Sequence, residues 1–178
     1  MEIRIAGITE ESIVDGPGLR MVIFAQGCPH NCEGCHNPDT HDIKAGYTVD
    51  TESLFSHIKK TVTRNKLLRG VTLSGGEPFL QPGPLSILAK QVKLLGLDIV
   101  TYSGFTFEQL TAMSIKNRHI GQLIRCTDIL VDGLYRENER DLGLAFRGSR
   151  NQRVIDVKAT LSADKVILWE EVAQRLWA

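Results

Sequence analysis

The hydrophobic and polar positions along the chain predict strands that alternate with helices. Residues 19–25 and 71–74 are short, nearly continuous apolar runs, which are typical of strands buried on both faces of a parallel sheet. Residues 51–65 and 84–95 carry apolar side chains at helical spacing, and Thr51 is a candidate N-cap for the first of these helices. The same reasoning predicts further strands near 3–8 and over 98–103, 128–133, 154–157 and 166–168, and further helices over 107–113, capped by Thr106, and over 170–176.

This alternation implies a parallel sheet with right-handed crossover connections. A closed eight-stranded barrel takes about 250 residues, and the chain has 178. We therefore expect a single α/β domain over residues 1–178, folded as a partial, open barrel of about five or six mainly parallel strands. A flat, doubly wound sheet is the alternative. In both folds the functional site lies at the carboxyl ends of the strands.

Composition and charge narrow the class of protein. The chain is 42% hydrophobic and 24% charged, as in an ordinary soluble globular protein. Lys and Arg together number 21, as do Asp and Glu, so the net charge gives no argument for a nucleic acid or membrane partner. The sequence contains no apolar run of about eighteen residues and no signal-peptide block at its start. We expect a cytoplasmic protein whose thiols stay reduced.

Three cysteines follow the apolar run at 19–25. Cys28, Cys32 and Cys35 fall within eight residues, and the one further cysteine is Cys126. Thiolates are soft ligands that suit iron–sulfur clusters, zinc and copper(I). Three thiolates on a 4Fe–4S cluster would leave one iron without a protein ligand, and such an iron can take a substrate.

Other interpretations of the cysteines stay open on residue spacing alone. A zinc site needs a fourth donor, which His30, His36 or Cys126 could supply. A disulfide framework is disfavoured, because the chain is long enough for a core and has no secretory segment. Three inert buried cysteines at this spacing are improbable, although Cys126 alone is expected to be a buried hydrophobic residue.

The cysteine motif and its neighbours resemble a known family. The pattern Cys-x3-Cys-x2-Cys resembles the cluster motif of radical S-adenosylmethionine (SAM) enzymes. Residues 14–20, Val-Asp-Gly-Pro-Gly-Leu-Arg, residues 35–38, Cys-His-Asn-Pro, and residues 74–78, Ser-Gly-Gly-Glu-Pro, resemble the glycyl-radical-enzyme activases. Residues 130–133 and 147–152 are most similar to the activases of anaerobic ribonucleoside-triphosphate reductase. The resemblance extends over residues 8–157.

The resemblance implies a radical SAM fold, a set of cofactors and the residues that hold them. Three ligands, Cys28, Cys32 and Cys35, would bind a 4Fe–4S cluster. The implied SAM contacts are Gly34, Cys35, His36, Ser74, Gly75, Gly76, Glu77 and Asp132. Glu77 would accept hydrogen bonds from an ammonium group, whereas Asp132 could equally complete an ordinary strand-end turn. Many radical SAM enzymes carry an aromatic residue at the position of Gly34, so a backbone contact is expected there.

The resemblance also implies a reaction and its partners. The enzyme would cleave SAM reductively and take a hydrogen atom from a glycine of anaerobic ribonucleotide reductase, with flavodoxin or ferredoxin as a reducing donor. The cofactors perform this chemistry, so no catalytic acid, base or nucleophile is expected. Asp15 and Gly16 would meet the glycine loop of the partner beside the cluster, unless residues 15–18 form only a tight turn.

Two other functional classes stay open. The chain could activate another glycyl radical enzyme, such as pyruvate formate-lyase, or act on a small molecule. It could also be a non-catalytic iron–sulfur or zinc-binding module that carries electrons. Residues 136–153 contain five arginines. Three roles are open for them: they could form a solvated face, dock an acidic partner or hold the SAM carboxylate, and the sequence does not decide among these.

Overall fold

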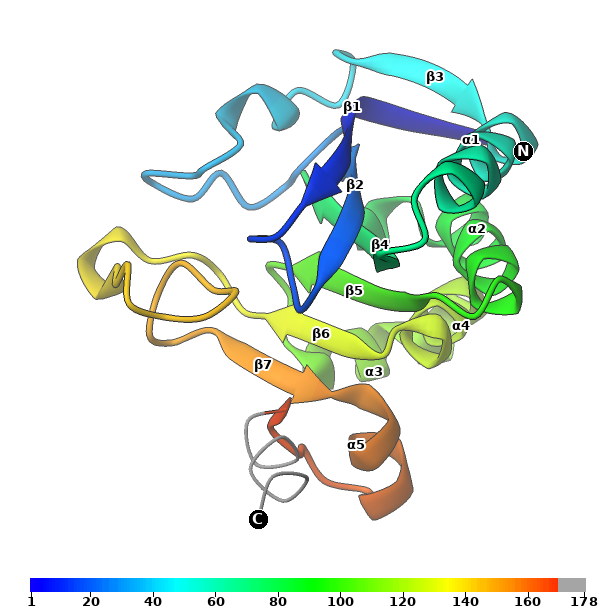
Figure 1. The fold of residues 1–178 in the computed structure, drawn as a ribbon. Coiled ribbons are helices and arrows are strands. Elements are labelled where there is room, and N and C mark those ends of the chain that lie inside the picture. Colours follow the sequence, from blue (N-terminus) through cyan, green and yellow to red (C-terminus); the bar gives the residue numbers. More distant parts are fainter. Residues whose placement is uncertain (170–178) are drawn as a thin grey trace.

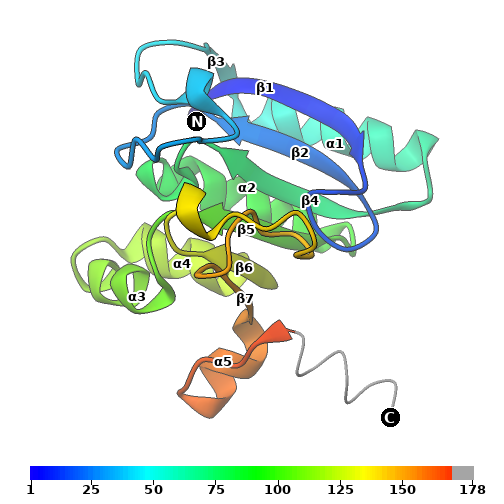
Figure 2. The same cartoon turned by 90° about the vertical axis from the view of Figure 1, so that its left-hand side faces the viewer.

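A computed structural model describes residues 1–169 and contains one seven-stranded sheet with helices packed on one of its faces (Figures 1 and 2). The strand order is β3-β1-β2-β4-β5-β6-β7. The strands are β1 (Glu2–Ser12), β2 (Leu19–Ala25), β3 (Tyr47–Asp50), β4 (Leu68–Gly75), β5 (Asp98–Ser103), β6 (Ile129–Asp132) and β7 (Arg153–Asp156). The helices are α1 (Thr51–Arg64), α2 (Pro82–Leu94), α3 (Phe107–Lys116), α4 (Arg118–Cys126) and α5 (Val157–Ala163), with short 3-10 turns at Pro38–Thr40, Pro78–Leu80 and Glu137–Glu139.

The centre of the sheet is parallel and its edges are antiparallel. Strands β2, β4, β5 and β6 pair in parallel, while β1 and β3 on one side and β7 on the other pair antiparallel with their neighbours. Helices α1 to α4 lie on one side of the curved sheet (Figure 1). The predicted α/β fold and partial, open barrel are confirmed, and the doubly wound alternative, which needs helices on both faces, is wrong. The strands exceed the expected number because β3 is short and mostly exposed, so it has no apolar pattern.

The main apolar core lies between the sheet and the helices. Successive residues of β5 show the alternation that divides the two faces: Ile99 belongs to this core, and Val100 belongs to a smaller apolar cluster on the opposite face. Tyr102 packs at the edge of the smaller cluster. The second face of the sheet therefore carries only a small apolar cluster and is not covered by helices α1 to α4.

Arg20 lies inside the apolar run that forms β2 and is fully buried. Its guanidinium donates to the Thr72 hydroxyl at 2.8 Å and to the backbone oxygens of Pro17 and Val71, and it lies 2.5 Å from the Asp98 carboxylate. These partners satisfy a charge that would otherwise be costly to bury. By donating both to Pro17 and to residues of β4, Arg20 also links the turn before β2 to the middle of the sheet.

Several predicted details differ from the structure. The cap of α1 is Asp50 rather than Thr51, because the Asp50 carboxylate accepts the amide hydrogens of Glu52 and Ser53. Thr106 caps α3 as predicted, in a capping box with Gln109. The strand expected at 166–168 is reduced to a single bridge between Ile155 and Leu168. The helix expected at 170–176 lies outside the described residues.

Helices α4 and α5 were not predicted. Helix α4 is short, but it turns Ile120, Leu123 and Ile124 into the core at the spacing of an amphipathic helix. No helix in residues 1–169 is long and apolar enough to cross a membrane.

Candidate iron–sulfur and cofactor site

The loop that carries the three cysteines begins where β2 ends and is closed at its base. The Gln26 side-chain amide donates to the backbone oxygens of Asp39 at 3.1 Å and Asp42 at 2.7 Å. The Gly27 amide donates to the backbone oxygen of Thr40 at 2.8 Å. The loop thus leaves the sheet and returns to it at one place, at the carboxyl end of a central parallel strand.

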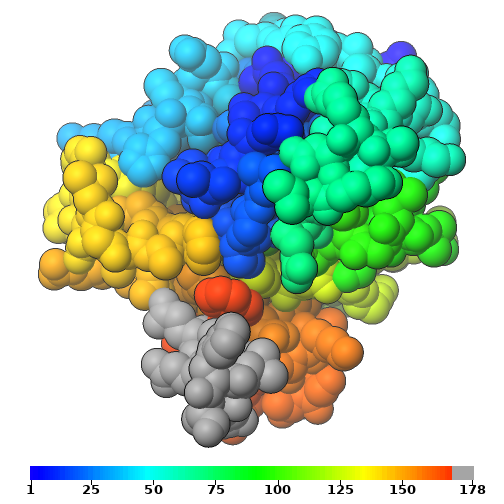
Figure 3. Space-filling model, viewed as in Figure 1, coloured from blue at the N-terminus to red at the C-terminus, as the bar shows by residue number. Residues whose placement is uncertain are grey.

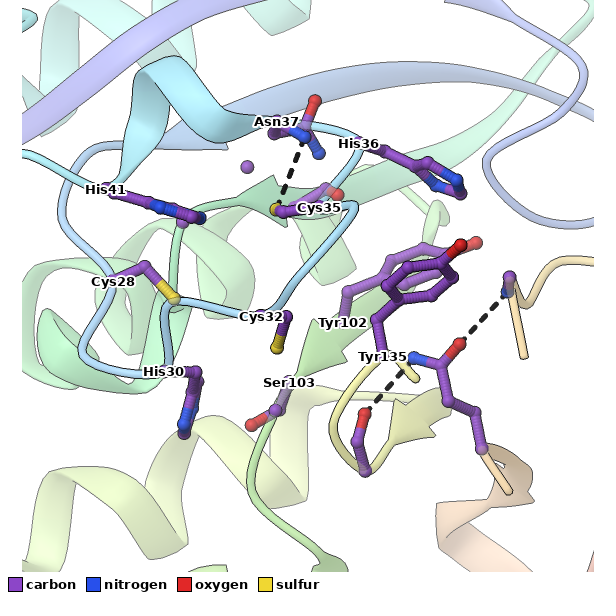
Figure 4. Close-up of a pocket in the computed structure, with 17 residues that line it drawn as sticks. Cys28, His30, Cys32, Cys35, His36, Asn37, His41, Tyr102, Ser103 and Tyr135 are labelled. Atoms are coloured by element: carbon purple, nitrogen blue, oxygen red, sulfur yellow. Dashed lines mark hydrogen bonds between the residues drawn. The ribbon is translucent and has the colours of Figure 1, made fainter. Parts of the chain in front are cut away.

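The three cysteines are free, partly exposed and line one pocket (Figure 4). The rest of the lining comes from the cysteine loop itself, from the ends of β4 and β5, and from the segment 133–152. These residues are His30, His36, Asn37, His41, Ser74, Gly75, Gly76, Tyr102, Ser103, Gly104, Gly133, Tyr135, Gly148 and Gln152. In the space-filling view the light-blue cysteine-loop region rests against the yellow part of segment 133–152 (Figure 3). The pocket joins Cys28, Cys32, Cys35 and His36 with Ser74, Gly75 and Gly76, as predicted from the positions of the strand ends.

The surroundings of the thiols fit a cluster. The Asn37 amide donates to the Cys35 sulfur at 3.4 Å. Among the described residues, no three His, Cys, Asp or Glu side chains gather closely enough to hold a single metal ion. The Nε2 atom of His41 is buried in the same pocket without a hydrogen-bond partner. A histidine ring nitrogen at this position can donate a hydrogen bond to a sulfur atom of a cluster. Three cysteines that are too far apart for a single metal ion, together with this possible donor, fit an iron–sulfur cluster better than one ion.

The end of β4 approaches the end of β2 closely. Gly75 has φ of +92°, and a Cβ at this position would lie 2.7 Å from the Ala25 backbone nitrogen. The Gly76 amide donates to the Ala25 backbone oxygen at 2.8 Å. Glycine is required here, and it leaves the backbone of β4 open to the pocket.

Glu77 is fully buried behind the pocket lining. Its carboxylate contacts His30 Nε2 at 3.0 Å, the Ser103 hydroxyl at 3.0 Å, and the amides of Gly104 at 2.9 Å and Phe79 at 3.0 Å. Because His30 lies between Cys28 and Cys32, the carboxylate ties the cysteine loop to the end of β5. The predicted contact between Glu77 and an ammonium group stays a prediction.

Asp132 is also buried and lies in an adjoining cavity. Its carboxylate accepts hydrogen bonds from Arg153 Nε at 2.9 Å and from the Phe107 amide at 2.7 Å. Arg153 also pairs with Glu108 at 2.8 Å and lowers the pKa of that carboxyl to about 2. These contacts support the interpretation of Asp132 as a strand-end anchor, and its role toward SAM stays a prediction.

Segment 133–152 is folded back on itself by one side chain, Gln152. Its amide oxygen accepts the Gly148 amide hydrogen at 3.0 Å and the Ser149 amide hydrogen at 3.2 Å, and its amide nitrogen donates to the Gly133 backbone oxygen at 3.1 Å. The Asn151 side chain donates to the Leu134 backbone oxygen at 2.7 Å. The side chains of Asn151 and Gln152 in the pattern Gly-Ser-x-Asn-Gln therefore hold segment 133–152 in the shape in which it lines the pocket.

Three arginines of this segment, and Arg153 directly after it, are engaged in ion pairs. Arg136 pairs with Glu139, Arg140 with Glu137, Arg150 with Asp141, and Arg153 with Glu108 and Asp132. Three of these pairs lie wholly within the segment, which favours a solvated face. Docking of an acidic partner stays a prediction.

Asp15 lines another cavity, distinct from the one at Asp132, that shares residues with the pocket. This cavity is lined by Val14 and Asp15 together with pocket residues His36, Ser74 and Tyr102. The Asp15 carboxylate accepts a hydrogen bond from the Ser12 hydroxyl at 2.5 Å. Gly16 packs instead toward Arg20 and Val100, and Gly34 lies against Tyr135 and Glu137 rather than in the pocket lining.

Four residues that line the pocket had no role expected from the sequence: His41, Tyr102, Tyr135 and Gln152. For Gln152 the sequence did offer an indication, because this residue is the last of the family motif at 147–152. Burial raises the pKa of Tyr102, whose hydroxyl donates to the Phe146 backbone oxygen at 2.7 Å. Cys126 packs against the main core, as predicted for a buried hydrophobic residue.

Comparison with known proteins defines the class and then the family. A family model described as a 4Fe-4S single cluster domain matches residues 14–155, which places the chain among single-cluster iron–sulfur proteins. The chain is 34% identical over 148 residues to the anaerobic ribonucleoside-triphosphate reductase-activating protein of Vibrio cholerae, with 79% of this chain and 89% of that protein covered. It therefore belongs to the family of anaerobic ribonucleoside-triphosphate reductase-activating proteins.

Two further similarities extend this comparison. The pyruvate formate-lyase-activating enzyme of Staphylococcus epidermidis is 34% identical over 160 residues, with 88% of this chain and 62% of that enzyme covered. Among solved structures, QueE from Escherichia coli is similar at 20% identity and a TM-score of 0.45, over 60% of this chain and 54% of that one.

Proposed function

We propose that this chain is a radical SAM enzyme that generates the glycyl radical of an anaerobic ribonucleotide reductase. One observation carries the proposal: three free cysteines on one loop share a pocket with the glycine-bearing end of the neighbouring strand β4. When bound and reduced, a 4Fe–4S cluster supplies the electron that splits SAM into methionine and a 5′-deoxyadenosyl radical, which takes a hydrogen atom from the partner's glycine. Membership of the activase family supports this reaction.

We assign the ligation of the cluster to Cys28, Cys32 and Cys35. This ligand set leaves one iron for the amino and carboxylate groups of SAM. The partly exposed backbone of Gly75 and Gly76 lines the pocket and suits hydrogen bonds to the amino acid part of SAM, since no side chain obstructs the approach. Ser74 and His36 line the same pocket and complete the assignment. Glu77 and Asp132 would act from behind this lining, by holding the loops in place.

The partner's glycine has a route to the pocket. The cavity beside Asp15 shares His36, Ser74 and Tyr102 with the pocket, so a peptide loop entering there would reach the cysteine loop. Helices α1 to α4 lie on the other side of the sheet and do not cover this face (Figure 1). We further propose a flavodoxin or ferredoxin as the electron donor and the cytoplasm as the compartment, where thiols stay reduced.

The test compares two cysteine variants after anaerobic cluster reconstitution. We expect Cys32→Ala to lose iron and to stop cleaving SAM. The matched control is Cys126→Ala, which removes a free cysteine that packs against the core outside the pocket and should leave both measurements unchanged. Reductive SAM cleavage by Cys32→Ala at the rate of the unmodified protein would contradict the proposal.

A second measurement identifies the target. The unmodified protein, SAM and a reductant are incubated with anaerobic ribonucleotide reductase or with pyruvate formate-lyase, and electron paramagnetic resonance detects a glycyl radical. We expect the radical on the reductase, because the chain covers 89% of the reductase activase but only 62% of the pyruvate formate-lyase activase. A radical on pyruvate formate-lyase alone would move the assignment to that enzyme.

A further inference from the structure

Tyr135 comes from segment 133–152 and lines the pocket beside the end of the cysteine loop that carries His36 (Figure 4). Its hydroxyl donates to the Glu137 carboxylate, and the centre of its ring is 5.0 Å from the centre of the His36 ring, with the planes tilted by 46°. The ring is thus anchored at both ends: the phenol by a charged acceptor, and the ring edge by a neighbour from the cysteine motif.

Two glycines make the space in which this ring lies. A Cβ at Gly34 would be 3.4 Å from Tyr135 Cε1, and a Cβ at Gly148 would be 3.0 Å from its Cδ2. Gln152 fixes Gly148 by accepting its amide hydrogen and fixes Gly133, two residues before Tyr135, by donating to its oxygen. The ring is therefore held in one orientation before any ligand arrives, which is what a binding platform requires.

We propose that the Tyr135 ring is the surface on which the adenine of SAM stacks. This inference rests on the proposed function, since the adenine enters the site only as part of SAM. Stacking of a base on an aromatic ring contributes about 1–3 kcal/mol, which corresponds to roughly 5- to 150-fold in affinity. The backbone contact expected at Gly34 from the sequence is then replaced by a ring that a distant segment supplies.

The other rings near the pocket are less suited to this role. Tyr102 is partly buried, its ring packs against the smaller apolar cluster, and its hydroxyl donates to the Phe146 backbone oxygen. Phe105 packs edge-on against His30, with ring centres 4.5 Å apart, and also packs against the main apolar core. His36 already lies against Tyr135. Tyr135 combines partial exposure, a fixed orientation and a place in the lining with a position outside both apolar clusters, so its ring is not already used in core packing.

Equilibrium binding to the reconstituted protein tests the proposal with three probes: SAM, 5′-methylthioadenosine and methionine. The second probe has the adenine without the amino acid group, and the third has the amino acid group without the adenine. We expect Tyr135→Leu to weaken binding of SAM and of 5′-methylthioadenosine at least fivefold and to change methionine binding less than twofold. Tyr135→Phe keeps the ring but loses the hydrogen bond to Glu137, so it should bind both adenine probes more tightly than Tyr135→Leu does. Tyr47→Leu, which alters an exposed tyrosine on β3, should bind all three probes like the unmodified protein.

The outcomes separate this proposal from the function on which it rests. Unchanged binding of both adenine probes by Tyr135→Leu would overturn the stacking while leaving SAM binding at the cluster intact. An equal loss for methionine would also overturn it, because the ring would then act through the shape of the loop. Failure of the unmodified protein to bind SAM would reject both. Should Tyr135→Leu fail to fold, photolabelling of the unmodified protein with an 8-azidoadenosine analogue of SAM decides: attachment within 133–152 supports the stacking, and attachment elsewhere alone rejects it.

Discussion

Replacement of Glu77 by alanine removes the acceptor that joins the cysteine loop to the end of β5. The buried carboxylate accepts the amide hydrogens of Phe79 and Gly104 and the Ser103 hydroxyl, and it contacts His30. A buried donor left without an acceptor costs about 1–3 kcal/mol. With partial relief by entering water, we expect Glu77→Ala to lower the free energy of unfolding by about 3 kcal/mol, a roughly 150-fold change in the folded-to-unfolded ratio.

The glutamine variant should show a graded effect. One oxygen of the pair becomes an amide nitrogen, which donates and cannot accept the Gly104 amide hydrogen. We expect Glu77→Gln to lose about 1–2 kcal/mol. Urea unfolding followed by circular dichroism measures the stability of both variants. If the slope of the free energy of unfolding against urea concentration is unchanged, the substitution has altered stability and not the surface exposed on unfolding. Glu33→Ala, which alters an exposed carboxylate of the same loop, is the control and should unfold like the unmodified protein.

Iron content gives the second assay for Glu77. Once His30 is released, the loop between Cys28 and Cys32 loses its tie to β5, and we expect the alanine variant to retain less iron per chain after anaerobic reconstitution than the Glu33→Ala control. The anchoring role is refuted if Glu77→Ala keeps full stability and full iron and loses only affinity for SAM. That result would instead assign the carboxylate to the SAM amino group, as the resemblance implied.

Three further predictions follow from other contacts. Arg20→Met should lower the free energy of unfolding by about 2–3 kcal/mol, because it removes a buried guanidinium that serves four acceptors; an unfolding midpoint like that of the unmodified protein would contradict this. The pKa of Glu108 is lowered from 4.5 to about 2 by Arg153, so the pair contributes stability above about pH 4.5 that is lost as the pH falls toward 2. Because Glu108 is largely exposed, Glu108→Gln should cost only about 0.5 kcal/mol at pH 6 and less at pH 3, whereas a cost independent of pH would reject the linkage. His41→Phe should lower the reduction potential of the bound cluster by roughly 40 mV, since it removes a ring nitrogen that lines the pocket and could donate to the cluster sulfurs; an electron paramagnetic resonance redox titration that shows no shift would disprove this donor role.

The sequence predicted the location of the site because strand patterns and strand ends are local properties. The apolar runs at 19–25 and 71–74 identify buried parallel strands, and each is followed directly by its motif. Parallel pairing of β2 with β4 then brings the two motifs to one edge of the sheet without any knowledge of the loops. The one charged residue in the first run, Arg20, is compatible with burial only because Thr72 and Asp98 come from neighbouring strands.

The contacts of segment 133–152 could not be predicted in the same way. Its polar composition has no periodicity, and its shape depends on Gln152 reaching the backbone of Gly133 and Gly148 at the same time. Likewise, a glycine at position 34 indicates only that a side chain is missing. The reason becomes visible when Tyr135 and Glu137 are found against it in the fold.

The two acidic residues at strand ends show why residue type alone does not define a ligand. Glu77 was expected to contact the SAM ammonium group, and Asp132 either to contact SAM or to complete a strand-end turn. Each carboxylate is hydrogen-bonded to backbone amides and to a His or Arg side chain, and the contacts with SAM stay predictions. Among the described residues, the pocket lining contains no Asp or Glu. If the three cysteines bind a cluster as proposed, their thiolates bring negative charge to the pocket, and a carboxylate about 4 Å from one of them would cost about 4 kcal/mol of repulsion at an effective dielectric constant of about 20. Acidic side chains that anchor loops from behind the pocket wall are therefore more compatible with the proposed cluster and the SAM carboxylate than acidic side chains in the lining would be.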